Sequence, residues 1–332
     1  MPGAARLVKI LTGIAISAVL LAYLFWNVDL RAVTTRLADT QWSWLALSMA
    51  LNLASLWARA ARWRYLFPPS SHPKRLFNAV IIGYMGNNVL PLRAGEVLRV
   101  YVAARHGPRV WTTVATLVVE RALDGLAVGV LLAFVFSVVP VPREMAWAAQ
   151  VFGAFVVCLL VALVIIAAAP LPCRIVIHSL SYRWPAVERR LIQAFDVMSE
   201  GLQAMRRPRQ LLPVAFWSAV IWFVIVLTVW AGFRAAHLDL PLLAGCAVIA
   251  FVGLGVSLPS SPGFVGVVQA ATVLALALFD VAKADALSFS LLLHASQFVP
   301  VTIWGLALLV VEHVSLTAGA RRPDLSAGAQ QD

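Results

Sequence analysis

A polar segment interrupts a long apolar stretch between residues 76 and 106. It reads "GNNVLPLRAGE" over residues 86–96, and with the arginine just beyond it supplies the following amide, guanidinium and carboxylate groups: Asn87, Asn88, Arg93, Glu96 and Arg99. A helix that restarts after Pro91 would present free backbone N–H groups, which together with such donors suit an anion such as phosphate. The segment predicts a site for an anionic group. The alternative is an ordinary surface loop whose arginines reach water.

A second polar group lies in "ERALDG", inside a later apolar run. Glu120 and Asp124 are four residues apart and share a helix face, and Arg121 and Asp124 are three apart and close enough to pair. Charged side chains at membrane depth are costly, so we expect these to face the bundle interior or a wet cavity. They would either contact substrate or form an internal ion pair that joins two helices.

Arg59 and Arg62 lie near the end of the second apolar run, in "WARAARWRYLF". Basic residues between spans on the cytoplasmic side often hold an anionic lipid headgroup. The other interpretation is a charged stop to the span, with side chains that extend to the interface.

The C-terminal half contains a second polar break, "LPSSPGFVGVVQ" at residues 258–269. It contributes Ser261, Gly263 and Gln269 as candidate binding residues, and Gln297 lies three residues beyond His294 in the last apolar run. Irregular backbone at membrane depth needs protein or water around it, so the prolines of both breaks predict a cavity. A lone histidine such as His294 more often makes a helix–helix contact than a ligand contact.

Several kinds of chemistry have no motif in this sequence. There is no G-x-x-x-x-G-K-[ST], H-E-x-x-H or C-x-x-C, and the three cysteines have no paired spacing. We therefore expect no metal, no cofactor, no catalytic residue and no enzyme activity. The net charge of +11 is distributed along the spans, which argues against a nucleic-acid partner.

The elements that would position these residues are membrane helices. Hydrophobic residues make up 61% of the chain and charged residues 12%, and several runs reach the length of a transmembrane helix. We predict an all-α, polytopic membrane protein with about six full spans and two broken or re-entrant hairpins, about eight membrane segments in all. The spans fall near residues 8–26, 42–60, 112–139, 147–169, 213–233 and 286–311, and the hairpins at 76–106 and 241–279. Two short full spans fit the second hairpin equally well.

The distribution of basic residues predicts the orientation. With the N-terminus inside, 20 of the 26 basic residues fall on the cytoplasmic side, so both termini are expected there. We assign residues 1–316 to one membrane domain, residues 185–205 to an amphipathic helix on the inner leaflet, and residues 317–332 to a disordered cytoplasmic tail.

The two breaks resemble each other. "LPLRAGEV" and "LPSSPGFV" share the pattern L-P-x-x-x-G-x-V, and the charge distribution places them in opposite orientations. Many transporters use such an inverted repeat to build a substrate site near the midplane. The alternative is a chance match between common residues.

Four segments, in order, give the sequence a resemblance to a known family: "RAARWRYLF", "GNNVLPLRAGEVLRVY", "ERALDG" and "LPSSPGFVGVVQAA". Over nearly its whole length the chain resembles the lysylphosphatidylglycerol synthase transmembrane-region family, also called flippase-like membrane proteins. The resemblance implies binding or movement of a lipid, such as a phospholipid, a polyprenyl-linked sugar or a hopanoid precursor. Gln269 stands where members commonly carry glutamate, which argues against a proton-carrying role there. The aminoacyl-transferase domain of some members has no room in this chain, so lipid lysylation is not expected.

Three functions remain open from the sequence. The leading one is a lipid translocator of the bacterial inner membrane, with an anionic or lipid-linked headgroup held at the broken hairpins. The second is a membrane-embedded enzyme or enzyme subunit for lipid-linked substrates, and the third is a scaffold for a lipid-biosynthetic enzyme. The expected partner is a membrane lipid, and the sequence sets no oligomeric state.

Overall fold

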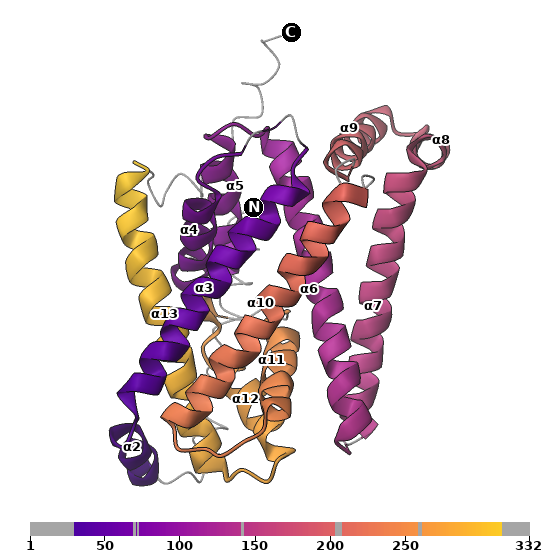
Figure 1. The fold of residues 1–332 in the computed structure, drawn as a ribbon. Coiled ribbons are helices and arrows are strands. Elements are labelled where there is room, and N and C mark those ends of the chain that lie inside the picture. The colour runs from indigo at the N-terminus through magenta and orange to yellow at the C-terminus, as the bar shows by residue number, and fades with distance from the viewer. Residues whose placement is uncertain are drawn as a thin grey trace, which may run out of the picture.

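The structure, a computed structural model, describes residues 30–68, 71, 73–140, 143–202, 208–257 and 261–313. Within these ranges every regular element is a helix (Figure 1), which confirms the predicted all-α class. The predicted first span at residues 8–26 and the predicted tail at residues 317–332 lie outside the described residues.

Each half of the chain contains a broken helical hairpin between two longer helices. The first set is α3 (Trp42–Leu66), α4 (Leu76–Val89), the 3-10 turn η2 (Pro91–Arg93), α5 (Gly95–Ala104) and α6 (Val110–Val138). The second set is α10 (Pro208–Ala235), α11 (Leu242–Ser257), the 3-10 turn η4 (Pro262–Phe264), α12 (Val267–Ala277) and α13 (Lys283–Val311). Both regions that the sequence predicts to be broken are therefore interrupted helices.

The two sets have matching helix lengths and matching contacts. The helices have 25, 14, 10 and 29 residues in the first set and 28, 16, 11 and 29 in the second. α3 packs along α10, while α4 packs on α13 and α11 packs on α6. A two-fold operation that exchanged the sets would preserve these contacts. Figure 1 shows the first hairpin in the upper part of the bundle and the second in the lower part.

The remaining helices lie at the ends and edge of the bundle. They are α2 (Leu30–Ala38), α7 (Arg143–Ala168), α8 (Pro170–Ser181) and α9 (Pro185–Leu202). α9 is a helix where the sequence predicts one, and it packs against α6, α7 and α8. α2 and α8 are not predicted. α8 begins at Pro170, and proline favours the first position of a helix. In the sequence the same proline directly follows the predicted span at residues 147–169.

Among the described residues, three helices are long and apolar enough to cross a membrane, over Val110–Val138, Gln210–Ala235 and Lys283–Val311. Shorter apolar helices cover Gln150–Ala162, Leu242–Ser257 and Pro262–Ala277. The protein is a helical membrane protein on this basis. The predicted total of about eight segments, with re-entrant hairpins, stays a prediction.

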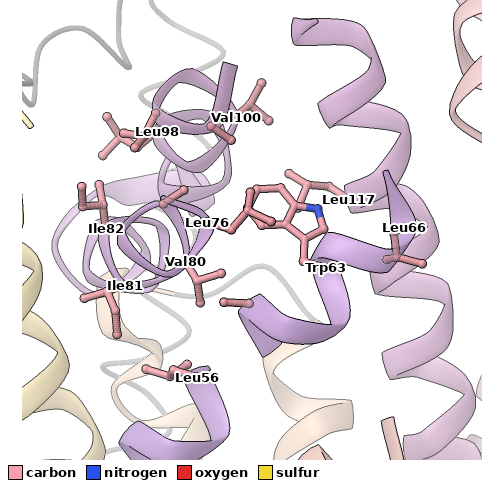
Figure 2. Close-up of a cluster of buried hydrophobic side chains, with 14 of the residues drawn as sticks. Leu56, Trp63, Leu66, Leu76, Val80, Ile81, Ile82, Leu98, Val100 and Leu117 are labelled. Atoms are coloured by element: carbon pink, nitrogen blue, oxygen red, sulfur yellow. The ribbon is translucent and has the colours of Figure 1, made fainter. Parts of the chain in front are cut away.

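One hydrophobic core lies between α3, α4, α5 and α6, and its largest side chain is Trp63, which is completely buried. Figure 2 shows its indole ring among aliphatic side chains of α4, α5 and α6, and the cluster includes Leu76, Val80, Val100 and Leu117. The indole N–H donates to the hydroxyl of Thr116 on α6 at 3.0 Å. This packing fixes α3 against α5 and α6, the three helices that carry the charged residues.

Candidate functional site

The two helix breaks lie in contact with each other. The Arg93 guanidinium of η2 lies over the Phe264 ring of η4, 5.4 Å from its centroid. Gly263 packs so closely that a Cβ added to it would lie 3.2 Å from the carbonyl oxygen of Asn88 and 2.8 Å from the Phe298 ring. Segments about 170 positions apart in the sequence thus meet at one place in the bundle.

Each break uses left-handed backbone. Leu92 and Arg93 have φ of +58° and +54°, and Gly263 and Phe264 have φ of +69° and +59°. Three of these four residues carry a side chain, for which this conformation is uncommon. Such backbone persists only where the surrounding packing requires it, and it is concentrated at binding and catalytic sites.

Gly95 allows α5 to restart directly against α4. A Cβ at this position would overlap the carbonyl oxygen of Gly83 and the backbone nitrogen of Asn87. A Cβ at Gly86, on the opposite side of the contact, would approach the Gly95 Cα to 2.6 Å. The two glycines bring the backbones of the hairpin together and so bring Asn87 next to Glu96.

Asp124 of α6 holds both arginines of α3. Arg59 donates to one carboxylate oxygen and Arg62 to the other, each at 2.8 Å. Arg62 is completely buried and also contacts the Ser218 hydroxyl of α10 at 3.3 Å. The guanidinium groups of both residues thus have a carboxylate partner inside the bundle. Their predicted contact with a lipid headgroup stays a prediction.

Glu120 forms a second buried pair one turn away. Its two oxygens accept from the two terminal nitrogens of Arg99 at 2.8 and 2.7 Å, the bidentate geometry that makes such pairs strong. The Arg99 guanidinium also stacks over Trp63, 4.0 Å from the ring. Arg99 and Glu120 are 1% and 0% exposed. Glu120 is thus part of an internal ion pair between two helices, but its partner is Arg99, which the sequence analysis assigns to the first break.

Arg121 belongs to the more accessible side of the same network. It pairs with Glu96 at 2.9 Å, and its contact with Asp124, which the sequence predicts, is longer at 3.7 Å. The Asn87 amide reaches the same Glu96 carboxylate at 3.5 Å. The Arg121 side chain is 40% exposed, and Arg93 next to it is also exposed. We call the contact between η2 and η4, together with the charged side chains of α3, α5 and α6 beside it, the joint. Arg93, Glu96 and Arg121 are thus the charged groups at the joint that a ligand could reach.

The second break contributes polar groups without charge. The Gln269 side chain accepts from the backbone N–H of Gly266 at 2.7 Å, which caps α12, and its amide group contacts His294 Nδ1 at 2.9 Å. Asn88 of the first break donates to the Thr302 hydroxyl of α13 at 2.9 Å. The Ser261 hydroxyl donates to the Val265 carbonyl at 3.2 Å. Gln297 on α13 is half-buried. These residues connect the breaks to α12 and α13.

Some residues of this region have no signal in the sequence. Ser218 and Trp222 of α10 and Tyr84 of α4 surround the Arg59 and Arg62 side chains, but they are ordinary residues of apolar helices. Their helix spacing allows a core position as readily as a site position. Only the packing of α10 along α3 identifies them.

Other features of the molecule lie away from this joint. A cavity of about 480 Å³ opens at the opposite end of α3 and α10, lined by Trp44, Trp230, Arg234 and neighbouring polar residues. In the ranges that the structure describes, no group of three or more histidine, cysteine, aspartate or glutamate residues could hold a metal ion. The three cysteines are unpaired.

A comparison with known protein families matches most of the chain. The profile described as the lysylphosphatidylglycerol synthase TM region matches residues 10–305, which include both hairpins and every arginine of the joint. The chain belongs to this family. The resemblance stated from the four sequence segments is confirmed. No solved structure matches the chain.

A relative from Haloferax volcanii, glycosyltransferase AglD, is 27% identical over 351 residues. The match covers 95% of this chain and 56% of the relative, so the chain spans about half of that protein's length. The relative's name contradicts the expectation that this chain has no enzyme activity.

Proposed function

We propose that this family member binds the anionic headgroup of a membrane lipid at the joint of the two hairpins and moves it between the leaflets. The observation that carries the proposal is the pair of accessible guanidinium groups, Arg93 and Arg121, at a helix break inside a membrane bundle. A charged group in such a place is costly unless it has a partner or a polar pathway. Arg121 already pairs with Glu96, whereas Arg93 has no carboxylate partner among the described residues, and a lipid phosphate would supply one.

The arrangement of the hairpins supports movement as well as binding. The charge distribution favours an orientation with the first hairpin on the cytoplasmic side of a bacterial inner membrane and the second on the outer side. Two broken hairpins that meet at the midplane from opposite sides are the arrangement by which inverted-repeat transporters alternate access. The matched helix lengths of the two sets support the same interpretation.

Lipid analysis of the purified protein tests the binding step. Arg93→Ala should lower the amount of anionic lipid that co-purifies in mild detergent, as measured by mass spectrometry. Arg64→Ala is the matched control, because Arg64 is an exposed arginine at the end of α3 with no part in the joint. If the Arg93 variant keeps its lipid and its transport in vesicles, the joint is not the headgroup site.

A second candidate function rests on the relative. We propose that the chain could equally serve a glycosyl-transfer reaction on a lipid-linked substrate, since AglD is named a glycosyltransferase. Incubation of the purified chain with a radiolabelled sugar donor and a membrane lipid extract tests this. Labelled lipid that depends on Arg93 would favour the enzyme-related role, whereas lipid that changes leaflet without label would favour translocation.

A further inference from the structure

The charged side chains at the joint do not balance. The cluster contains five arginines, Arg59, Arg62, Arg93, Arg99 and Arg121, and three carboxylates, Glu96, Glu120 and Asp124. Each carboxylate pairs with at least one guanidinium group, so we count all three as ionised, and arginine keeps its charge in proteins. No other acidic residue of the described ranges pairs with this cluster. Counted over the described residues, the joint therefore carries two positive charges in excess.

Buried polar groups without a hydrogen-bond partner occur in the same cluster. They are the Nε–H donors of Arg62, Arg99 and Arg121 and the acceptors Asn87 Oδ1 and Glu96 Oε2, so donors outnumber acceptors by one. Arg93 forms no ion pair with a described carboxylate, and its guanidinium group lies over the Phe264 ring face. Uncompensated charge within a low-dielectric bundle is costly, and an excess of two is most stable when the bound group brings two negative charges.

Resting on the proposed function, we infer that the joint selects a lipid whose headgroup is a phosphomonoester or a diphosphate. A phosphomonoester carries between one and a half and two negative charges near pH 7, because its second pKa is about 6. A phosphodiester such as phosphatidylglycerol carries one, and a lysylated phosphatidylglycerol carries a net positive charge. The accessible groups, Arg93 and Arg121, would contact the phosphate oxygens. Arg59, Arg62 and Arg99, which are paired and lie deeper, would add to the positive electrostatic potential at the phosphate.

Titration of lipids with matched acyl chains into the delipidated full-length protein tests this inference, with occupancy read by native mass spectrometry. The probes are phosphatidic acid, phosphatidylglycerol, lysyl-phosphatidylglycerol and inorganic phosphate. One additional charge at the site should make phosphatidic acid bind about tenfold more tightly than phosphatidylglycerol. Lysyl-phosphatidylglycerol should bind most weakly. Inorganic phosphate that competes as well as phosphatidic acid would identify a soluble ligand and overturn the lipid assignment.

Charge variants should change the selectivity in opposite directions. Arg93→Gln lowers the excess to one, so the preference for phosphatidic acid should disappear while phosphatidylglycerol still binds. Glu96→Gln raises the excess and should increase the preference. Arg64→Gln, which changes the same charge outside the joint, should leave the ratio unchanged.

The pH dependence provides an independent readout. Below about pH 6 a phosphomonoester loses its second charge, so phosphatidic acid should then bind no better than phosphatidylglycerol. The titratable side chains around the joint are Tyr84, Glu96, Glu120, Asp124 and His294. These side chains surround both lipids alike. The ratio of the phosphatidic acid affinity to the phosphatidylglycerol affinity at each pH therefore cancels their contribution.

The outcomes separate this inference from the proposed function. If both lipids bind equally and both depend on Arg93, the joint is an anionic headgroup site and the charge inference is wrong. If neither lipid depends on Arg93, the proposed function itself fails.

Discussion

At the residue scale, the joint shows a division between buried ion pairs and accessible charges. Arg62, Arg99 and Glu120 are almost completely buried, whereas the side chains of Arg121 and Glu96 are 40% and 29% exposed. Buried pairs fix the geometry, since a charge left alone in the bundle would be strongly unfavourable. The exposed groups remain free to exchange one partner for another.

Asp124→Asn tests the buried pairs. The substitution leaves Arg59 and Arg62 buried without their carboxylate, so we expect it to destabilise the protein by about 3–5 kcal/mol. Asp285→Asn removes the exposed pair of Asp285 with Arg36 and should cost less than about 1 kcal/mol. Thermal unfolding in detergent measures both. Equal melting temperatures for the two variants would contradict the role of Asp124.

The sequence identifies the members of the joint better than their partners. Charged residues are rare in this chain, so Glu120, Arg121 and Asp124 are conspicuous within an apolar helix. Their spacing favours local pairing, but the shortest bonds of Asp124 run to α3, more than 60 positions away. Tertiary packing decides such partners, and periodicity within one helix carries no information about it.

At the element scale, the hairpin depends on close contact between its two helices. Gly95→Ala would place a Cβ against the backbone of α4, so α5 must shift or the glycine contact must open. We expect a loss of about 1–3 kcal/mol in stability, as overpacking typically causes, together with loss of lipid binding.

Gly129→Ala is the control for this substitution. A Cβ at Gly129 on α6 would have no neighbour within 4 Å, and alanine favours a helix by about 1 kcal/mol over glycine. Its melting temperature should stay the same or rise. A Gly95 variant with unchanged melting temperature and lipid binding would show that the backbone contact is not required.

A second element-scale feature joins α13 to both ends of the first hairpin. Glu312, just beyond α13, accepts from Asn78 at 2.6 Å, from His106 at 2.7 Å and from Arg75 at 3.3 Å. Burial acts to raise the pKa of the Glu312 carboxyl, but these hydrogen bonds outweigh it and hold the pKa below its ordinary value. The ionised form is therefore the one that stabilises the fold.

Glu312→Gln should weaken this connection by about 1–3 kcal/mol at pH 7. Because the folded pKa is lowered, the stabilisation is complete above the ordinary value of 4.5 and is lost as the pH falls through the folded pKa. The difference in melting temperature between wild type and variant should thus shrink at pH 4. Asp239→Asn, at a side chain that is 90% exposed, should show no difference at either pH. A difference independent of pH would exclude the carboxylate as its source.

The sequence predicts both breaks but aligns them differently from the structure. The shared pattern pairs Pro91 with Pro259, whereas η2 and η4 begin at Pro91 and Pro262, and a glycine follows each four residues later. The structure therefore shifts the match by three residues. A short motif of common residue types does not fix its own register, while the position of a 3-10 turn does.

At the scale of the whole molecule, the orientation in the membrane is the main prediction. The distribution of basic residues places α9 on the cytoplasmic side and the connection between α10 and α11 outside. In a cysteine-free background, Arg189→Cys should resist a membrane-impermeant thiol reagent added from outside, and Asp239→Cys should react. Both side chains are exposed. Labelling at 189 but not at 239 would reverse the assignment.

The short helices of the first hairpin have a consequence for the bilayer itself. A helix of 10 residues such as α5 extends about 15 Å, which is half of the roughly 30 Å hydrocarbon layer. A guanidinium group exposed at the tip of such a helix draws water and headgroups inward, and the lipid layer thins around it. We expect the bilayer beside Arg93 to be locally thinned. A lipid phosphate that crosses there would traverse a much shorter dielectric barrier than one that crosses elsewhere in the membrane.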